Sequence, residues 1–187
     1  MSRTMRNNRV IFVGGCPGVG KSSLCQKIAC SRVGVRHEIA GQLIRQGIGA
    51  SEPGYIRPLV ATSAVADYYQ DILIETFSRV REVHEGHLIL DGHFIVPTKA
   101  GLQPVAAEVF QRLAVDVFVI VESRLETVVR RLRERGGREW WDGSSESVKI
   151  LIDSELEHAT NVARTLGKPL FRVNGEMDGV PDVEEWF

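Results

Sequence analysis

Two hydrophobic patterns alternate along the chain. Short apolar runs at residues 10–13, 87–91, 115–123 and 169–174 predict buried strands. Apolar residues that recur every three or four positions predict helices near 21–29, 38–46, 59–85, 125–132 and 148–166. Strands that alternate with helices indicate an α/β fold with a parallel sheet covered on both faces.

Three segments fit neither pattern: residues 47–58, 92–105 and 136–145. We expect irregular structure in all three. In an open α/β sheet such loops gather at the carboxyl ends of the strands, where ligands bind. Function is therefore expected to lie in these loops.

The length and composition favour one domain without a membrane or nucleic-acid partner. The 187 residues carry a net charge of −1, and no apolar run approaches the roughly 18 residues that span a bilayer. The basic residues are 18 Arg and 5 Lys, which reflects either phosphate binding or base composition. Three cysteines, at positions 16, 25 and 30, cannot all pair and form no Cys-x-x-Cys motif. The N-terminus also lacks the apolar core of a signal peptide. Together these features predict a cytoplasmic protein.

The strongest motif lies in "NRVIFVGGCPGVGKSSLCQKIA", where a strand pattern runs through glycines into a helix pattern. Gly15, Gly20, Lys21 and Ser22 satisfy the P-loop pattern G-x-x-x-x-G-K-[ST] in its required strand-to-helix context. Backbone N–H groups of such a loop converge on phosphate at a helix N-terminus. We expect the phosphates of ATP to contact Gly15, Gly18, Val19, Gly20, Lys21, Ser22 and Ser23. The lysine would reach the β and γ phosphates.

The strand that ends at Asp91 predicts the second half of a magnesium site. Asp91 and Ser22 together would hold Mg²⁺. Gly92 stands where a motor ATPase has a water-activating Glu, and the chain has no Asn-Lys-x-Asp sequence of the kind that reads guanine. These absences favour transfer to an acceptor other than water. His93 could bind a phosphate of the acceptor or Asp91, or could be a structural histidine in a turn.

A cluster of arginines follows the third predicted strand, at positions 130, 131, 133, 135 and 138. One interpretation is a solvated helix end, where cations meet the helix dipole favourably. The other is a lid over about 136–145, hinged at Gly136 and Gly137. Arg131, Arg135 and Arg138 would then close over the transferring phosphoryl group as catalytic residues.

The acceptor is expected opposite the P-loop, in a region over about 37–86. Its loop "SEPGYIRPL" contains Arg57, which could bind a monophosphate or could lie at the surface.

These motifs together resemble the archaeal-type adenylate kinases, a branch of the P-loop nucleoside monophosphate kinases. The similar segments are "GGCPGVGKSS", "SEPGYIRPL", "LILDGHFIVPTKAGLQP", "VVRRLRERGGRE" and "ELEHATNVARTLGKPLFRVN", which cover most of the chain. The resemblance implies a five-stranded parallel sheet with strand order 2-3-1-4-5. It also implies the reaction of ATP with AMP to give two ADP, with Mg²⁺, and places Arg57 at the AMP phosphate.

The chain departs from that pattern at two places. Gly92 stands where the archaeal branch has Thr, and Arg138 is followed by Glu139, Trp140 and Trp141 instead of a further arginine and an aspartate. The tryptophans could stack on adenine or form a contact between subunits of a homo-oligomer. Two other functions stay open: a kinase of another small acceptor, such as a nucleoside or coenzyme precursor, and a slow ATPase that acts as an assembly factor or sensor.

Overall fold

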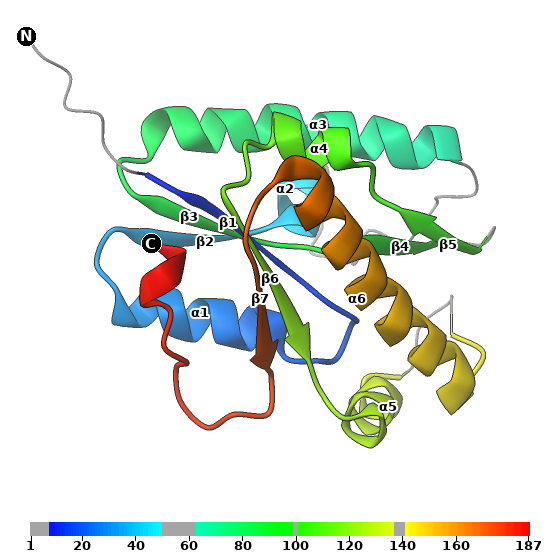
Figure 1. The fold of residues 1–187 in the computed structure, drawn as a ribbon. Helices are drawn as coiled ribbons and strands as arrows, with labels where there is room; N and C mark the ends of the chain where they lie inside the picture. Colours follow the sequence, from blue (N-terminus) through cyan, green and yellow to red (C-terminus); the bar gives the residue numbers. More distant parts are fainter. Residues whose placement is uncertain (1–7, 50–62, 99–100, 137–140) are drawn as a thin grey trace, which may run out of the picture.

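The computed structural model describes residues 8–49, 63–98, 101–136 and 141–187, with side chains from residue 67 onward in the second range (Figure 1). Its centre is a parallel sheet of five strands: β1 (Val10–Gly14), β2 (Val35–Ile39), β3 (His87–Asp91), β6 (Val117–Glu122) and β7 (Leu170–Asn174). The strands lie in the order β2-β3-β1-β6-β7. Numbered among themselves, these strands have the order 2-3-1-4-5, so the predicted fold class is confirmed.

Helices cover both faces of the sheet (Figure 1). They are α1 (Lys21–Ser31), α2 (Ala40–Gly47), α3 (Ser63–Val83), α4 (Ala107–Arg112), α5 (Leu125–Glu134) and α6 (Ser145–Leu166), followed by a 3₁₀ turn at Glu184–Trp186. Ile11 and Val13 of β1 pack into the core cluster that contains α1, while Val10 and Phe12 pack into the cluster that contains α3 and α4. Both faces of β1 are therefore buried, which explains why its sequence is a continuous apolar run.

The pattern of apolar residues missed the edge strand β2. Its residues Arg36, His37 and Glu38 are charged or polar, and none of the five positions is fully buried. β2 pairs on one side only, with β3, so the backbone pairing rather than an apolar face holds it in the sheet. The helix predicted from residue 38 accordingly begins at Ala40.

The expectation of irregular structure over 92–105 is wrong. This segment forms an antiparallel hairpin of β4 (Ile95–Thr98) and β5 (Gly101–Pro104) that stands apart from the main sheet. Each strand has only four residues, too few to show a clear alternation, and each contains a proline, which weakens the strand signal. Phe94 and Val105 at the base of the hairpin are buried, so the hairpin is anchored in the core.

Candidate active site

The P-loop connects β1 to α1 by a turn that only glycine adopts easily. Gly15, Gly18 and Gly20 have φ values of 136°, 95° and 108°, in the left-handed region that favours glycine. Lys21 follows as the first residue of α1. The predicted strand, loop and helix are thus present with the glycines where the turn requires them.

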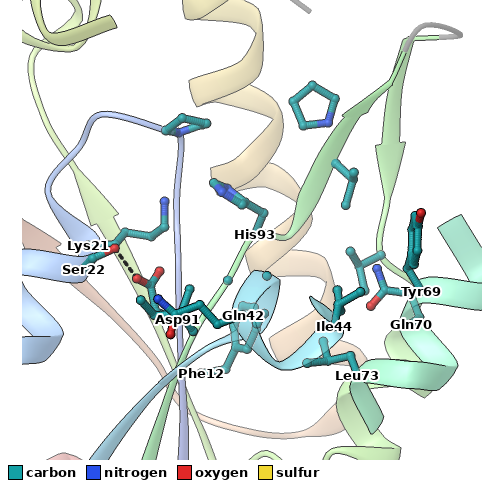
Figure 2. A pocket seen from close by; sticks show the side chains of 18 of the residues that line it. Phe12, Lys21, Ser22, Gln42, Ile44, Tyr69, Gln70, Leu73, Asp91 and His93 are labelled. Carbon is teal, nitrogen blue, oxygen red and sulfur yellow. Dashed lines mark hydrogen bonds between the residues drawn. The ribbon is translucent and has the colours of Figure 1, made fainter. Parts of the chain in front are cut away.

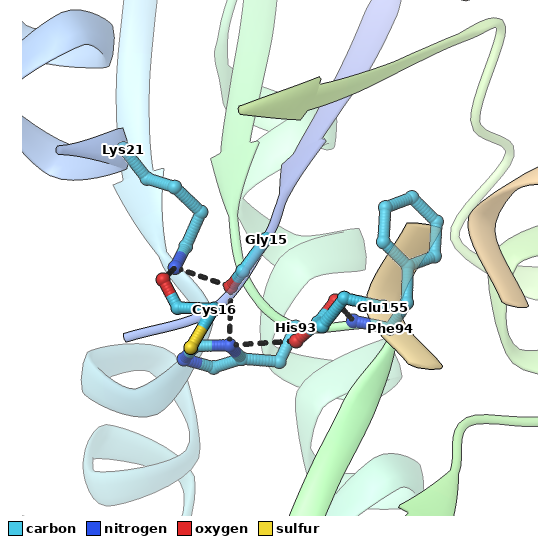
Figure 3. A network of polar contacts seen from close by, with 6 residues as sticks. All are labelled: Gly15, Cys16, Lys21, His93, Phe94 and Glu155. Atoms are coloured by element: carbon cyan, nitrogen blue, oxygen red, sulfur yellow. Dashed lines mark hydrogen bonds and ion pairs between the residues drawn. The ribbon is translucent and has the colours of Figure 1, made fainter. Parts of the chain in front are cut away.

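Lys21 is held inside this loop. Its side chain is buried, and Nζ donates hydrogen bonds to the carbonyl oxygens of Gly15 at 2.7 Å and Cys16 at 3.2 Å (Figure 3). Burial raises the pKa of the neighbouring Cys16 thiol to about 12, so this cysteine stays neutral and leaves the lysine as the charge of the loop. The positive group lies where the loop would hold the phosphates.

Asp91 reaches the P-loop because β3 pairs with β1 in a register that sets Asp91 beside Val13. The Ser22 hydroxyl donates a short hydrogen bond to Oδ2 of Asp91 (Figure 2). Burial acts to raise the pKa of Asp91, but interactions with His37, Lys21 and the Ser22 hydroxyl outweigh it, so the pKa is lowered. Ser22 and an ionised Asp91, predicted as one pair from the sequence, are therefore in contact.

His93 contacts the P-loop directly and is also held by Glu155, a residue that no sequence motif indicated. Its Nδ1 lies 2.9 Å from the carbonyl oxygen of Gly15 and 3.1 Å from Oε1 of Glu155, and the N–H of Phe94 donates to Oε2 of Glu155 at 2.9 Å (Figure 3). Because a carbonyl only accepts, Nδ1 carries the proton in this contact. Glu155 is 1% exposed and comes from α6. Its only signal in the sequence was a charged residue on the apolar face of a predicted helix.

The arginines of the predicted lid separate into different environments. Arg131 donates from Nη1 to the carbonyl oxygen of Gly18 at 2.9 Å, and this hydrogen bond links α5 to the P-loop. Arg135 ends the helix and lines the cavities described below. Arg130 pairs with Glu134 at 3.0 Å on the exposed face of α5. Arg138 lies outside the described residues.

Two further predicted positions, Arg57 and Trp140, also lie outside the described residues. The ring of Trp141 packs against the core, and its Nε1 donates to the carbonyl oxygen of Ser144 at 2.7 Å. Ser144 in turn caps α6 by accepting from the N–H of Ser147. Trp141 thus fixes the entry into α6.

Two glycines are required by close packing. A Cβ at Gly175, just after β7, would lie 2.1 Å from the carbonyl oxygen of Val19 and 2.8 Å from a methyl group of Val121. A Cβ at Gly92 would lie 2.9 Å from the ring of Phe12. The Phe12 ring therefore accounts for glycine at position 92, where the archaeal-type adenylate kinases have Thr. Gly175 lets the loop after β7 lie directly on the P-loop.

Two cavities meet at the P-loop. The larger, of about 430 Å³, lies on the β3 side and the smaller, of about 320 Å³, lies on the β7 side. Gly18, Gly20, Ser23 and Arg135 line both. Figure 2 shows Lys21, Ser22, Asp91 and His93 at one end of the larger cavity and Ile44, Tyr69, Gln70 and Leu73 at the other. The two cavities thus adjoin at the P-loop and at Arg135.

Comparison with known proteins agrees with this geometry. Residues 14–149 match the family described as AAA domain. The chain is 30% identical over 166 residues to adenylate kinase isoenzyme 1 of Cyprinus carpio, with 82% of this chain and 78% of the relative covered. The chain belongs to the nucleoside monophosphate kinase family of P-loop kinases.

Solved structures with the same fold extend beyond nucleotide kinases. The shikimate kinase of Bacteroides thetaiotaomicron matches this P-loop kinase with a TM-score of 0.58 at 17% identity, over 91% of this chain and 89% of that one. The tunicamycin resistance protein of Deinococcus radiodurans matches with a TM-score of 0.56 at 14% identity, over 87% and 97%. At these identities the likeness shows the fold alone. Within the described residues, the kinase has no helix of the length and apolarity that crossing a membrane requires.

Proposed function

We propose that this P-loop kinase transfers the γ-phosphoryl group of ATP to a nucleoside monophosphate, with AMP as the first candidate. The observation that carries the proposal is the pair of cavities that share the P-loop and Arg135. A phosphotransferase needs two substrates in line, and a hydrolase needs only one and a water.

The smaller cavity suits the nucleoside of ATP. It is lined by Lys27, by residues 174–179 at the end of β7 and in the loop after it, and by Arg131. Gly175 presses this loop against Val19 of the P-loop, so a base held there would be attached to phosphates that already lie in the loop.

The larger cavity suits the acceptor. Ile39, Ile44, Leu73 and Val109 supply apolar walls for a base, and Gln42 and Gln70 offer groups that could read its edge. Arg45 of α2 also lines this cavity and is our candidate for the acceptor phosphate. Arg57 remains a second candidate, within an acceptor region of about 37–86. AMP is favoured because the curated relative is an adenylate kinase.

The residues at the end of the larger cavity fit Mg²⁺. The Ser22 hydroxyl and the ionised Asp91 carboxylate are hard oxygen donors in contact with each other. These two residues would hold the ion, which when bound supplies positive charge to the phosphate oxygens.

The chain's own groups would perform the rest of the transfer. Backbone N–H groups of residues 15–22 cradle the β and γ phosphates, and Lys21 follows the negative charge as it moves to the acceptor. Arg135 lies at the junction of the cavities, where it would neutralise the group in flight, and Arg131 keeps the loop in shape. Arg138 and a lid of about 136–145 would complete the enclosure, and His93 remains a candidate contact to the acceptor.

The test measures ADP formation from Mg-ATP with no acceptor and with AMP, CMP, UMP, GMP or shikimate in turn. Shikimate is included because fold neighbours are shikimate kinases. We expect rapid turnover that requires AMP and is absent in Lys21→Ala. Rapid turnover with another acceptor alone would reassign the substrate, and slow turnover indifferent to all acceptors would overturn the proposal in favour of an ATPase or sensor.

A further inference from the structure

Three potential metal ligands meet beneath the P-loop, and the proposed transfer uses only one of them. Cys25 comes from α1, His37 from β2 and Asp91 from the end of β3. One ligand atom of each lies within 4.8 Å of the other two. Cys25 is fully buried and Asp91 is 3% exposed, so the cluster is a built part of the interior.

The imidazole of His37 supplies an independent observation. Its Nε2 is buried and has no hydrogen-bond partner within the part of the chain that the structure describes. The atom lies 3.7 Å from Oδ2 of Asp91, close enough to act on that carboxylate electrostatically but longer than a hydrogen bond. Buried polar atoms in proteins are nearly always paired, so this nitrogen points to a missing partner.

We propose that Cys25, His37 and Asp91 form a binding site for a divalent cation of the zinc class. A thiolate, an imidazole and a carboxylate are the ligands that zinc and cobalt take in proteins, whereas Mg²⁺ prefers oxygen alone. Zinc–ligand distances of about 2.0–2.3 Å require the three atoms to approach one another by roughly an ångström from their present spacing. A fourth ligand would come from water or from the Ser22 hydroxyl, which already contacts Asp91.

Cation binding at this site releases a proton. A cation that takes Cys25 as a ligand binds its thiolate, so the thiol proton leaves to solvent.

The site would control the kinase through Asp91. This carboxylate lines the larger cavity, which gives the cation a route of entry. Once bound to a zinc-class cation, Asp91 is no longer available to Mg²⁺, so the proposed consequence is inhibition that more Mg²⁺ relieves. This consequence rests on the proposed function, while binding itself does not.

Binding is tested with Co²⁺ added to the full chain without nucleotide. A cysteine ligand gives a sulfur-to-cobalt charge-transfer band in the near ultraviolet, and Zn²⁺ should abolish it by displacement. We expect one equivalent of Co²⁺ to bind with this band. Cys25→Ser should remove the band. His37→Gln should weaken the binding of Co²⁺ by about tenfold to a hundredfold.

Cys30→Ser is the matched control because Cys30 lies on the same helix but is exposed. It should leave both band and affinity unchanged. A band that persists in Cys25→Ser, disappears in Cys30→Ser, or is never seen in the wild type would overturn the site. Should Cys25→Ser fail to fold, unchanged Co²⁺ affinity in His37→Gln overturns it instead.

Inhibition by Zn²⁺ is measured separately, with whichever acceptor the panel identifies. Absence of acceptor-dependent turnover with a normal cobalt band would count against the proposed function alone. Turnover with no cobalt band would count against the cation site alone.

Discussion

The two cavities beside the P-loop are built in different ways. The smaller is lined mostly by polar and charged residues and glycines, among them Lys27, Arg131, Glu176, Asp178 and Gly175. The larger is lined by side chains that come from β1, α2, α3, the hairpin and α4. The polar lining of the smaller cavity suits a charged ligand group, whereas apolar residues of the larger cavity such as Ile44, Leu73 and Val109 suit an apolar one.

The lysine of the P-loop should show the largest effect, because in the proposed transfer it follows the charge from one ligand to the other. Lys21→Ala removes the buried cation of the loop, and we expect kcat to fall by about 10²–10³-fold or more. The control is Lys149→Ala, since Lys149 is exposed and pairs with Asp153 on α6. Steady-state kinetics would contradict the assignment if the two variants behaved alike.

The packing beside the smaller cavity should be sensitive to one added methyl group. In Gly175→Ala the new Cβ meets the Val19 carbonyl, and overpacking of this kind costs about 1–3 kcal/mol. We expect the thermal midpoint to fall by several degrees and the KM for ATP to rise about tenfold, more than the KM for the acceptor.

Gly41→Ala provides the matched comparison for Gly175→Ala. Gly41 lies in α2, and nothing stands within 4 Å of the position its Cβ would take. Its thermal midpoint should stay level or rise, because Ala favours a helix. Equal thermal shifts in the two variants would mean that Gly175 is not tightly packed.

A change in the larger cavity should affect the KM for the acceptor alone. We expect Arg45→Ala to raise the KM for the acceptor about tenfold or more while the KM for ATP stays the same, because a hydrogen bond to a charged group contributes about 1.5–3 kcal/mol. Arg79→Ala, which removes an exposed arginine paired with Glu75 on α3, is the control. An unchanged acceptor KM in Arg45→Ala would leave Arg57 as the candidate.

The smallest effect is expected at the rim of the smaller cavity, in the dependence of stability on pH. Hydrogen bonds from the Arg124 side chain, the Ser123 hydroxyl and the Arg124 N–H lower the pKa of Glu176 from 4.5 to about 2. The folded pKa lies below the unfolded value, so this stabilisation is complete above about pH 4.5 and is lost as the pH falls towards 2.

Glu176→Gln should therefore have a lower thermal midpoint than the wild type near neutral pH, with a gap that narrows below pH 4.5. Glu126→Gln, which changes an exposed glutamate in the first turn of the same helix that Glu176 caps, is the control and should show no such gap. A gap for Glu176→Gln that stays constant with pH would contradict the ionised role.

The sequence by itself determined the parts of the protein whose physics is local. A P-loop needs its glycines, lysine and serine within eight consecutive residues. A strand buried on both faces must be apolar along its buried length, as residues 10–13 of β1, 88–90 of β3 and 117–121 of β6 are. The contact between Ser22 and Asp91 also followed, because the carboxyl ends of neighbouring parallel strands lie at one edge of a sheet.

The tertiary structure decided what depends on partners distant in the chain. The role of Glu155 could not be predicted because it depends on His93, 62 residues away in the chain. The edge strand β2 was missed because its pairing with β3, and not an apolar face, holds it in the sheet. Gly175 and Gly92 are fixed by Val19 and Phe12, contacts between segments that no local pattern records. Sequence periodicity reports which face of an element is buried, and only the packed fold reports which atoms it is buried against.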